Sequence, residues 1–81
     1  MKVIITFNEV IELNKLIEEQ KLPYRVHLSD ACGNQSLWIE PLGEQDSAKF
    51  FEPLHSLIED YFRQKDISVK FIKEGLDFIL Q

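Results

Sequence analysis

Residues 24–42 have the sequence YRVHLSDACGNQSLWIEPL, and they decide the predicted fold. Apolar and polar side chains alternate over residues 24–28 and again over residues 36–42, which is the period of a β-strand with one buried face. Asp, Gly and Asn between the two runs favour a turn, because Gly and Asn tolerate positive φ and Asp bonds nearby backbone amides. The stretch therefore predicts a β-hairpin whose connection is longer than two residues. Its core side is predicted to contain Tyr24, Val26, Leu28, Leu37 and Ile39.

The segment before the hairpin predicts a strand followed by a helix. Residues 1–7 are rich in β-branched side chains and alternate, which favours a first strand. Thr6 and Glu9 have the spacing of a capping box, and Asn8 is a competing N-cap. A helix is therefore expected from about residue 9 to residue 20, and Pro23 ends it. The apolar stripe of this helix consists of Val10, Leu13, Leu16 and Ile17.

A second helix and two further strands are predicted after the hairpin. The candidate N-cap of the helix is Asp46 or Ser47, and the helix extends to about residue 64. Pro53 either kinks this helix or lies in its first turn, where a proline costs no hydrogen bond. The later elements are a strand over residues 67–71, a turn at residues 73–75 and a strand over residues 76–80.

The order of the predicted elements is β-α-β-β-α-β-β, and each helix is apolar on one side. This pattern predicts a single α+β domain over residues 1–81, built as a two-layer sandwich with both helices on one face of the sheet. The first six elements follow the order of the split βαβ, ferredoxin-like arrangement. The extra C-terminal strand is expected to lie at the edge of the sheet.

Composition limits the classes of protein that fit. The 81 residues carry a net charge of −5 and include one cysteine, which cannot form an internal disulfide and so favours a reducing, cytoplasmic setting. The first residues lack the apolar core and cleavage site of a signal peptide, and no apolar run approaches the length of a membrane span. The acidic balance opposes nonspecific attraction to nucleic acid or anionic lipid, so neither partner is expected.

Cys32 lies in the predicted turn and is the first candidate for chemistry. A nucleophilic or redox thiol needs a cation or a histidine nearby, and the candidate neighbours are His27 and Asp30, as proton-handling groups or ligands. The negative charge of Asp30 disfavours a thiolate, and the alternative is a small turn side chain without a chemical role. Neither a metal nor another cofactor is expected, because Cys32, His27, Asp30 and His55 lack the paired spacing of a zinc site.

The sheet face that the helices leave uncovered is the second candidate site. A tryptophan among isoleucines and charged residues is typical of a recognition surface, because Trp and Arg concentrate at interface hot spots. The alternative is a modest apolar patch that stays in contact with water. The residues expected to bind a protein partner or a second copy of the chain are Trp38, Arg25, Ile4 and Ile72. The whole predicted face contains Ile4, Thr6, Arg25, His27, Trp38, Glu40, Lys70, Ile72 and Ile79.

Residues 27–36, HLSDACGNQS, resemble the central motif of a small uncharacterised bacterial family named RDAC after its Arg-Asp-Ala-Cys signature. Chain length and the order of the elements fit this family as well. Ser29 stands where the family name expects arginine, which removes the cation nearest to the thiol. The resemblance implies a bacterial, cytoplasmic origin and draws attention to Asp30, Cys32 and Gly33, but it implies no established activity.

Together these observations predict a small protein-interaction module without catalytic activity. The sequence contains no Gly-rich phosphate loop and no Ser-centred nucleophile motif. The alternative function is that of a thiol-dependent redox, transfer or metal-delivery protein centred on Cys32.

Overall fold

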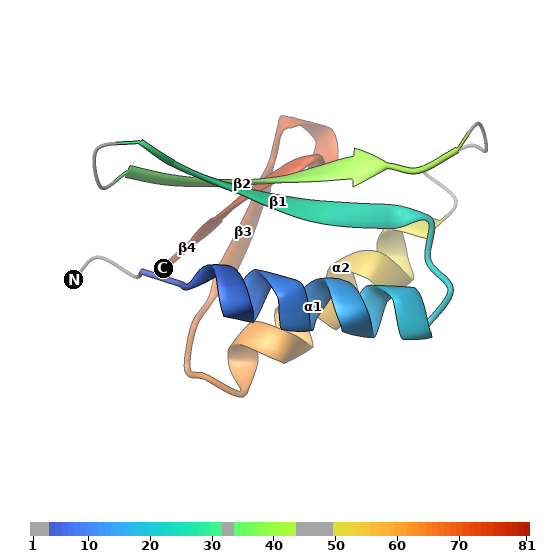
Figure 1. Ribbon diagram of the computed structural model, residues 1–81, viewed down its shortest axis with the longest axis horizontal. Coiled ribbons are helices and arrows are strands. Elements are labelled where there is room, and N and C mark those ends of the chain that lie inside the picture. The colour runs from blue at the N-terminus through green and yellow to red at the C-terminus, as the bar shows by residue number, and fades with distance from the viewer. Residues whose placement is uncertain (1–3, 32–33, 44–49) are drawn as a thin grey trace.

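The computed structural model describes residues 4–31, 34–43 and 50–81, and these form a sheet layer and a helix layer (Figure 1). The described residues make a four-stranded antiparallel sheet, and both helices lie on the same side of it. This arrangement confirms the predicted α+β two-layer sandwich. The described elements are α1 (Phe7–Glu19), β1 (Tyr24–Ala31), β2 (Asn34–Pro41), α2 (Phe51–Arg63), β3 (Val69–Ile72), the 3-10 turn η2 (Lys73–Gly75) and β4 (Asp77–Leu80).

The predicted hairpin is confirmed as β1 and β2, and its strands pair further than expected. The register starts with Tyr24 opposite Pro41 and continues to Ala31 opposite Asn34. Only positions 32 and 33 separate the paired strands, and both lie outside the described residues. The prediction of a connection longer than two residues was therefore wrong. The reason is that backbone hydrogen bonds do not depend on side-chain polarity, so the polar residues near the tip pair too.

The N-terminal strand predicted over residues 1–7 is not found in the part of that segment that is described. Residues 4–6 are irregular, and α1 already begins at Phe7. The capping box forms as predicted, since the Glu9 N–H donates to Thr6 Oγ1 at 3.2 Å and the Thr6 N–H donates to Glu9 Oε1 at 2.9 Å. The N–H of Ile5 donates to Gln35 Oε1 at 2.9 Å, and Gln35 Nε2 donates to the Ile5 carbonyl at 2.8 Å. A side-chain amide thus replaces the strand partner that Ile5 would have needed.

The C-terminal strand lies inside the sheet, although it was expected at the edge. The strand order is β1-β2-β4-β3, with Leu37 of β2 opposite Phe78 of β4 and Phe78 opposite Phe71 of β3. Among the described residues no N-terminal strand occupies the position beside β2, so β4 pairs there. The two edge strands are therefore β1 and β3.

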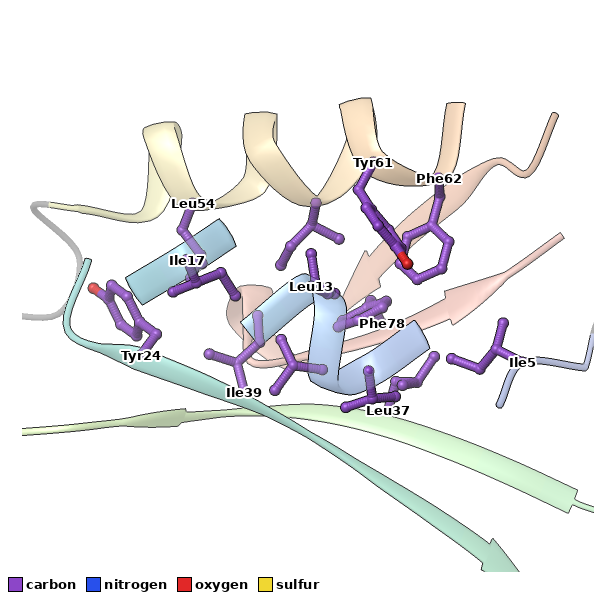
Figure 2. Packing of buried hydrophobic residues seen from close by; sticks show 13 residues of the cluster. Ile5, Leu13, Ile17, Tyr24, Leu37, Ile39, Leu54, Tyr61, Phe62 and Phe78 are labelled. Carbon is purple, nitrogen blue, oxygen red and sulfur yellow. The ribbon is translucent and has the colours of Figure 1, made fainter. Parts of the chain in front are cut away.

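The hydrophobic core fills the space between the two layers (Figure 2). Each fully buried aliphatic or aromatic side chain contributes about 1.5–3 kcal/mol relative to exposure. Pro53 lies in the first turn of α2, which begins at Phe51, so the helix loses no hydrogen bond and needs no kink. The candidate N-caps Asp46 and Ser47 lie outside the described residues. The labelled core side chains that point toward one another include Leu13, Ile17, Leu54, Phe62 and Phe78.

Candidate functional site

One row of side chains crosses the open face of the sheet from edge to edge. His27 of β1 lies opposite Trp38 of β2, and Trp38 lies opposite Asp77 of β4. Asp77 lies in turn opposite Ile72 of β3. Side chains alternate along a strand, and their neighbours Val26, Leu37 and Phe78 are buried on the helix side. These four residues, the cross-sheet row, therefore face away from both helices.

The aromatic part of the cross-sheet row is held in a fixed geometry. The ring centroids of His27 and Trp38 are 4.3 Å apart at an interplanar angle of 20°. His27 Nε2 lies 2.7 Å from Glu40 Oε1, and because a carboxylate only accepts, the ring nitrogen donates this hydrogen bond. The Trp38 side chain nevertheless remains 41% exposed. The result is a large aromatic surface that is both oriented and open to solvent.

The charged groups around the cross-sheet row differ in whether they have a bonding partner. Glu40 bonds to His27 although Arg25 is its direct partner in the register. Asp77 Oδ2 lies 3.5 Å from Lys73 Nζ. Within the part of the chain that the structure describes, no ion pair involves Arg25 or Lys70. The carboxylates of this face are therefore engaged, whereas two of its cations are left for other contacts.

Two residues predicted on this face do not belong to the sheet. Ile4 is exposed, but it precedes α1 in the irregular segment, and Thr6 is the N-cap of α1. Their assignment to the face depended on the N-terminal strand, so it was wrong for both. The other predicted binding residues, Trp38, Arg25 and Ile72, lie on strands as expected.

The predicted thiol cluster is only partly within the described residues. Cys32 lies outside them, and Asp30 is described as a strand residue opposite Gln35. His27 precedes Ala31 by four strand residues, about 13 Å at the usual rise, and its ring is bound to Glu40 and Trp38. The thiol hypothesis therefore stays a prediction, and the described geometry gives His27 a different set of partners. No group of three or more potential metal ligands comes together among the described residues.

The second histidine has a structural environment that the sequence did not predict. His55 of α2 stacks on Phe71 at 3.8 Å between centroids and on Phe51 at 5.1 Å. Its Nε2 lies 3.0 Å from the Gly75 carbonyl oxygen, which accepts the hydrogen bond. Three elements, α2, β3 and η2, meet at this ring. The local sequence signal for it was only a histidine beside a buried leucine.

Neither described helix has the length and apolar content needed to cross a bilayer. Comparison with known proteins assigns the chain to no family. No protein-family model matches the chain, and no similar curated protein or solved structure was found.

Proposed function

We propose that this protein is a small interaction module without catalytic activity, which binds a partner protein through the open face of its sheet. The observation that carries the proposal is the Trp38 ring, half-exposed and stacked on His27. Large aromatic side chains dominate binding energy when a partner removes them from water. Because the stack already fixes the ring, binding costs little side-chain entropy at this position.

The surroundings of Trp38 favour a partner that presents an apolar side chain beside carboxylates. Ile72 on β3 and the exposed Ile79 on β4 extend the apolar surface on the same face. Glu40 and Asp77 are bound to His27 and Lys73. Arg25 and Lys70 have no ion-pair partner among the described residues, so both cations are available to carboxylates of a partner. Positive charge at the rim complements an acidic partner surface and speeds its association.

Fluorescence of Trp38 tests this proposal directly, because it is the only tryptophan in the chain. In the free protein we expect acrylamide to quench Trp38 readily and light scattering to give a monomer mass. A monomer whose Trp38 is shielded from the quencher would overturn the proposal. Shielding that appears only together with a dimer mass would identify the partner as a second copy of the chain.

A matched pair of variants tests any candidate partner protein. Trp38→Ala is expected to weaken its binding by about tenfold or more, the loss typical of a hot-spot aromatic. Leu16→Ala removes an exposed apolar side chain from α1, away from this face, and should leave the affinity within about twofold. Equal binding by the wild type and Trp38→Ala would contradict the proposal.

A further inference from the structure

A groove of about 670 Å³ lies between α1 and β1, apart from the cross-sheet row. Helix α1 lies along β1, with its N-terminal end toward the tip of the hairpin (Figure 1). The groove is lined by side chains of both elements, together with residues of the turn between them and the residue that follows β2. The lining residues that matter here are Ile11, Lys15, Glu18, Lys21, Arg25 and Leu42.

Apolar side chains at this groove remain uncovered. Ile11 is 62% exposed, and Leu42 is exposed as well. Phe7, one helical turn before Ile11 on the same side of α1, is 61% exposed and continues the apolar surface toward the hairpin tip. Side chains of this size gain free energy when a partner covers them, and a group of them marks an interaction site more reliably than a single one.

The charge of the groove is opposite to that of the whole chain. Lys15, Lys21 and Arg25 line it together with one carboxylate, Glu18, whereas the chain carries a net charge of −5. None of these four side chains takes part in an ion pair within the described residues. The groove therefore attracts anionic groups although the chain as a whole is acidic.

The adjoining edge of β1 has backbone groups that accept an extended chain. Asn14 of α1 already binds this edge, since Asn14 Nδ2 donates to the Val26 carbonyl at 2.9 Å and the Val26 N–H donates to Asn14 Oδ1 at 2.7 Å. In an antiparallel ladder every second residue points its backbone groups the same way, so Leu28 also directs its N–H and C=O outward. No hydrogen bond to these groups of Leu28 is found from the described residues.

We propose that this groove binds an extended acidic segment of another protein. The segment pairs its backbone with β1 at Leu28, as an added strand. Its apolar side chains cover Phe7 and Ile11, and its carboxylates bind Lys15 and Lys21. The backbone groups of Leu28, which no described residue binds, lie on the strand beside the apolar side of α1 and fit a polypeptide, whereas a small free anion uses only the lysines. This site does not include Trp38 and does not depend on the function proposed for the open face.

The test titrates the isotopically labelled protein with a short synthetic peptide in which glutamate and valine alternate. We expect its NMR amide shifts to concentrate at Leu28 and along the groove side of α1, with the Trp38 indole signal unchanged. Lys15→Glu should weaken binding by at least about tenfold. Arg63→Glu makes the same charge change at an exposed position of α2, outside both the groove and the open face of the sheet, and it should leave the affinity within about twofold.

Each other outcome overturns the site. No shift at Leu28, or an equal loss in both charge variants, would mean that the groove does not select the peptide. Shifts at the Trp38 indole would place the peptide on the open face and leave the function proposed there intact. Glutarate, a dicarboxylate without a peptide backbone, should produce no shift at Leu28, and the same shifts with glutarate would show that the site takes a free anion only.

Discussion

The two histidines of this chain have similar contacts but lie in opposite surroundings. His27 stacks on Trp38 and donates to Glu40, and all three residues lie on the β1–β2 hairpin (the His27 cluster). His55 stacks between Phe51 and Phe71 and bonds to Gly75, so its partners come from three elements (the His55 cluster). The ring contacts in both clusters have nearly parallel planes.

The comparison separates contacts that build the fold from contacts that present a surface. Because the His55 cluster joins α2, β3 and η2, its loss disturbs the relative position of these elements. The His27 cluster joins two strands that many backbone hydrogen bonds already hold together, so its contacts add little to folding. What they do is orient an exposed tryptophan, the central residue of the proposed interaction surface.

The largest expected effect comes from the matched variants His55→Ala and His27→Ala. His55→Ala removes two aromatic contacts and one hydrogen bond, so we expect the free energy of unfolding to fall by about 2–3 kcal/mol. His27→Ala removes one stack and one hydrogen bond between side chains that are 32% and 46% exposed, so we expect less than about 1 kcal/mol. Urea unfolding followed by far-UV circular dichroism measures both. Equal losses would remove the distinction between the two clusters.

A conservative variant sharpens that measurement. His55→Phe keeps an aromatic ring between Phe51 and Phe71 and removes only the hydrogen bond to Gly75. The expected loss is about 1 kcal/mol, the net value of one hydrogen bond. A loss as large as that of His55→Ala would assign the stability to the hydrogen bond instead of the stacking.

Gly75→Ala breaks the same cluster from the other side. Gly75 has a φ of +87°, and a Cβ atom there would lie 2.7 Å from His55 Cε1. Strain at positive φ and the contact with the ring together predict a loss of about 2 kcal/mol. In the double variant Gly75→Ala/His55→Ala, the contact between the new Cβ atom and the ring is absent. The losses of the two single variants should therefore sum to more than the loss of the double variant. Strict additivity in urea unfolding would show that the ring and the glycine do not interact.

The sequence predicted local elements well where the alternation of apolar and polar residues itself determines which side chains are buried. Alternation over residues 24–28 placed Tyr24 and Val26 in the core, as observed. The N-terminal strand failed because Ile5 obtains its backbone partners from the Gln35 side chain, thirty residues away. Local β-branched residues resemble a strand whether or not such a distant amide replaces the neighbouring strand. Local patterns therefore do not reveal this contact.

The candidate site was predictable in composition but not in geometry. Trp38 and His27 were both expected on the open face, yet their stacking depends on the hairpin register. The predicted strands, residues 24–28 and 36–42, left the length of the connection open, and a change of one residue in that length places a different residue opposite His27. The His55 cluster was not predictable, because its partners meet only after α2 packs on the sheet.

Tyr61, on the side of the sheet that the helices cover, makes the stability of the protein depend on pH in the alkaline range. Burial raises the pKa of Tyr61 to about 12, and the carboxylates of Glu12 and Glu9 add to the effect. The folded protein thus holds the phenolic proton more tightly than the unfolded chain, in which tyrosine titrates near 10. The stabilisation is complete below about pH 10 and is lost as the pH rises from about 10 to about 12.

We expect the ionisation of Tyr61 to lower the free energy of unfolding by about 1 kcal/mol between pH 9 and pH 11. Tyr61→Phe cannot ionise and serves as the control, since lysines elsewhere also titrate in this range. The difference between the two proteins in urea unfolding isolates the phenol. An identical pH dependence in both would contradict the raised pKa.

The smallest expected effect links the His27 cluster to the thiol hypothesis. If the protein is an interaction module, Cys32 should alkylate as an ordinary thiol with an apparent pKa near 8.5. His27 is bound to Glu40 and lies about 13 Å of strand from Ala31, so His27→Ala should leave the alkylation rate unchanged within about twofold. Iodoacetamide kinetics between pH 6 and pH 10 measure both quantities. A thiolate that reacts well below pH 8, and slows in His27→Ala, would show that His27 serves Cys32, and the thiol-dependent function would then replace the interaction module.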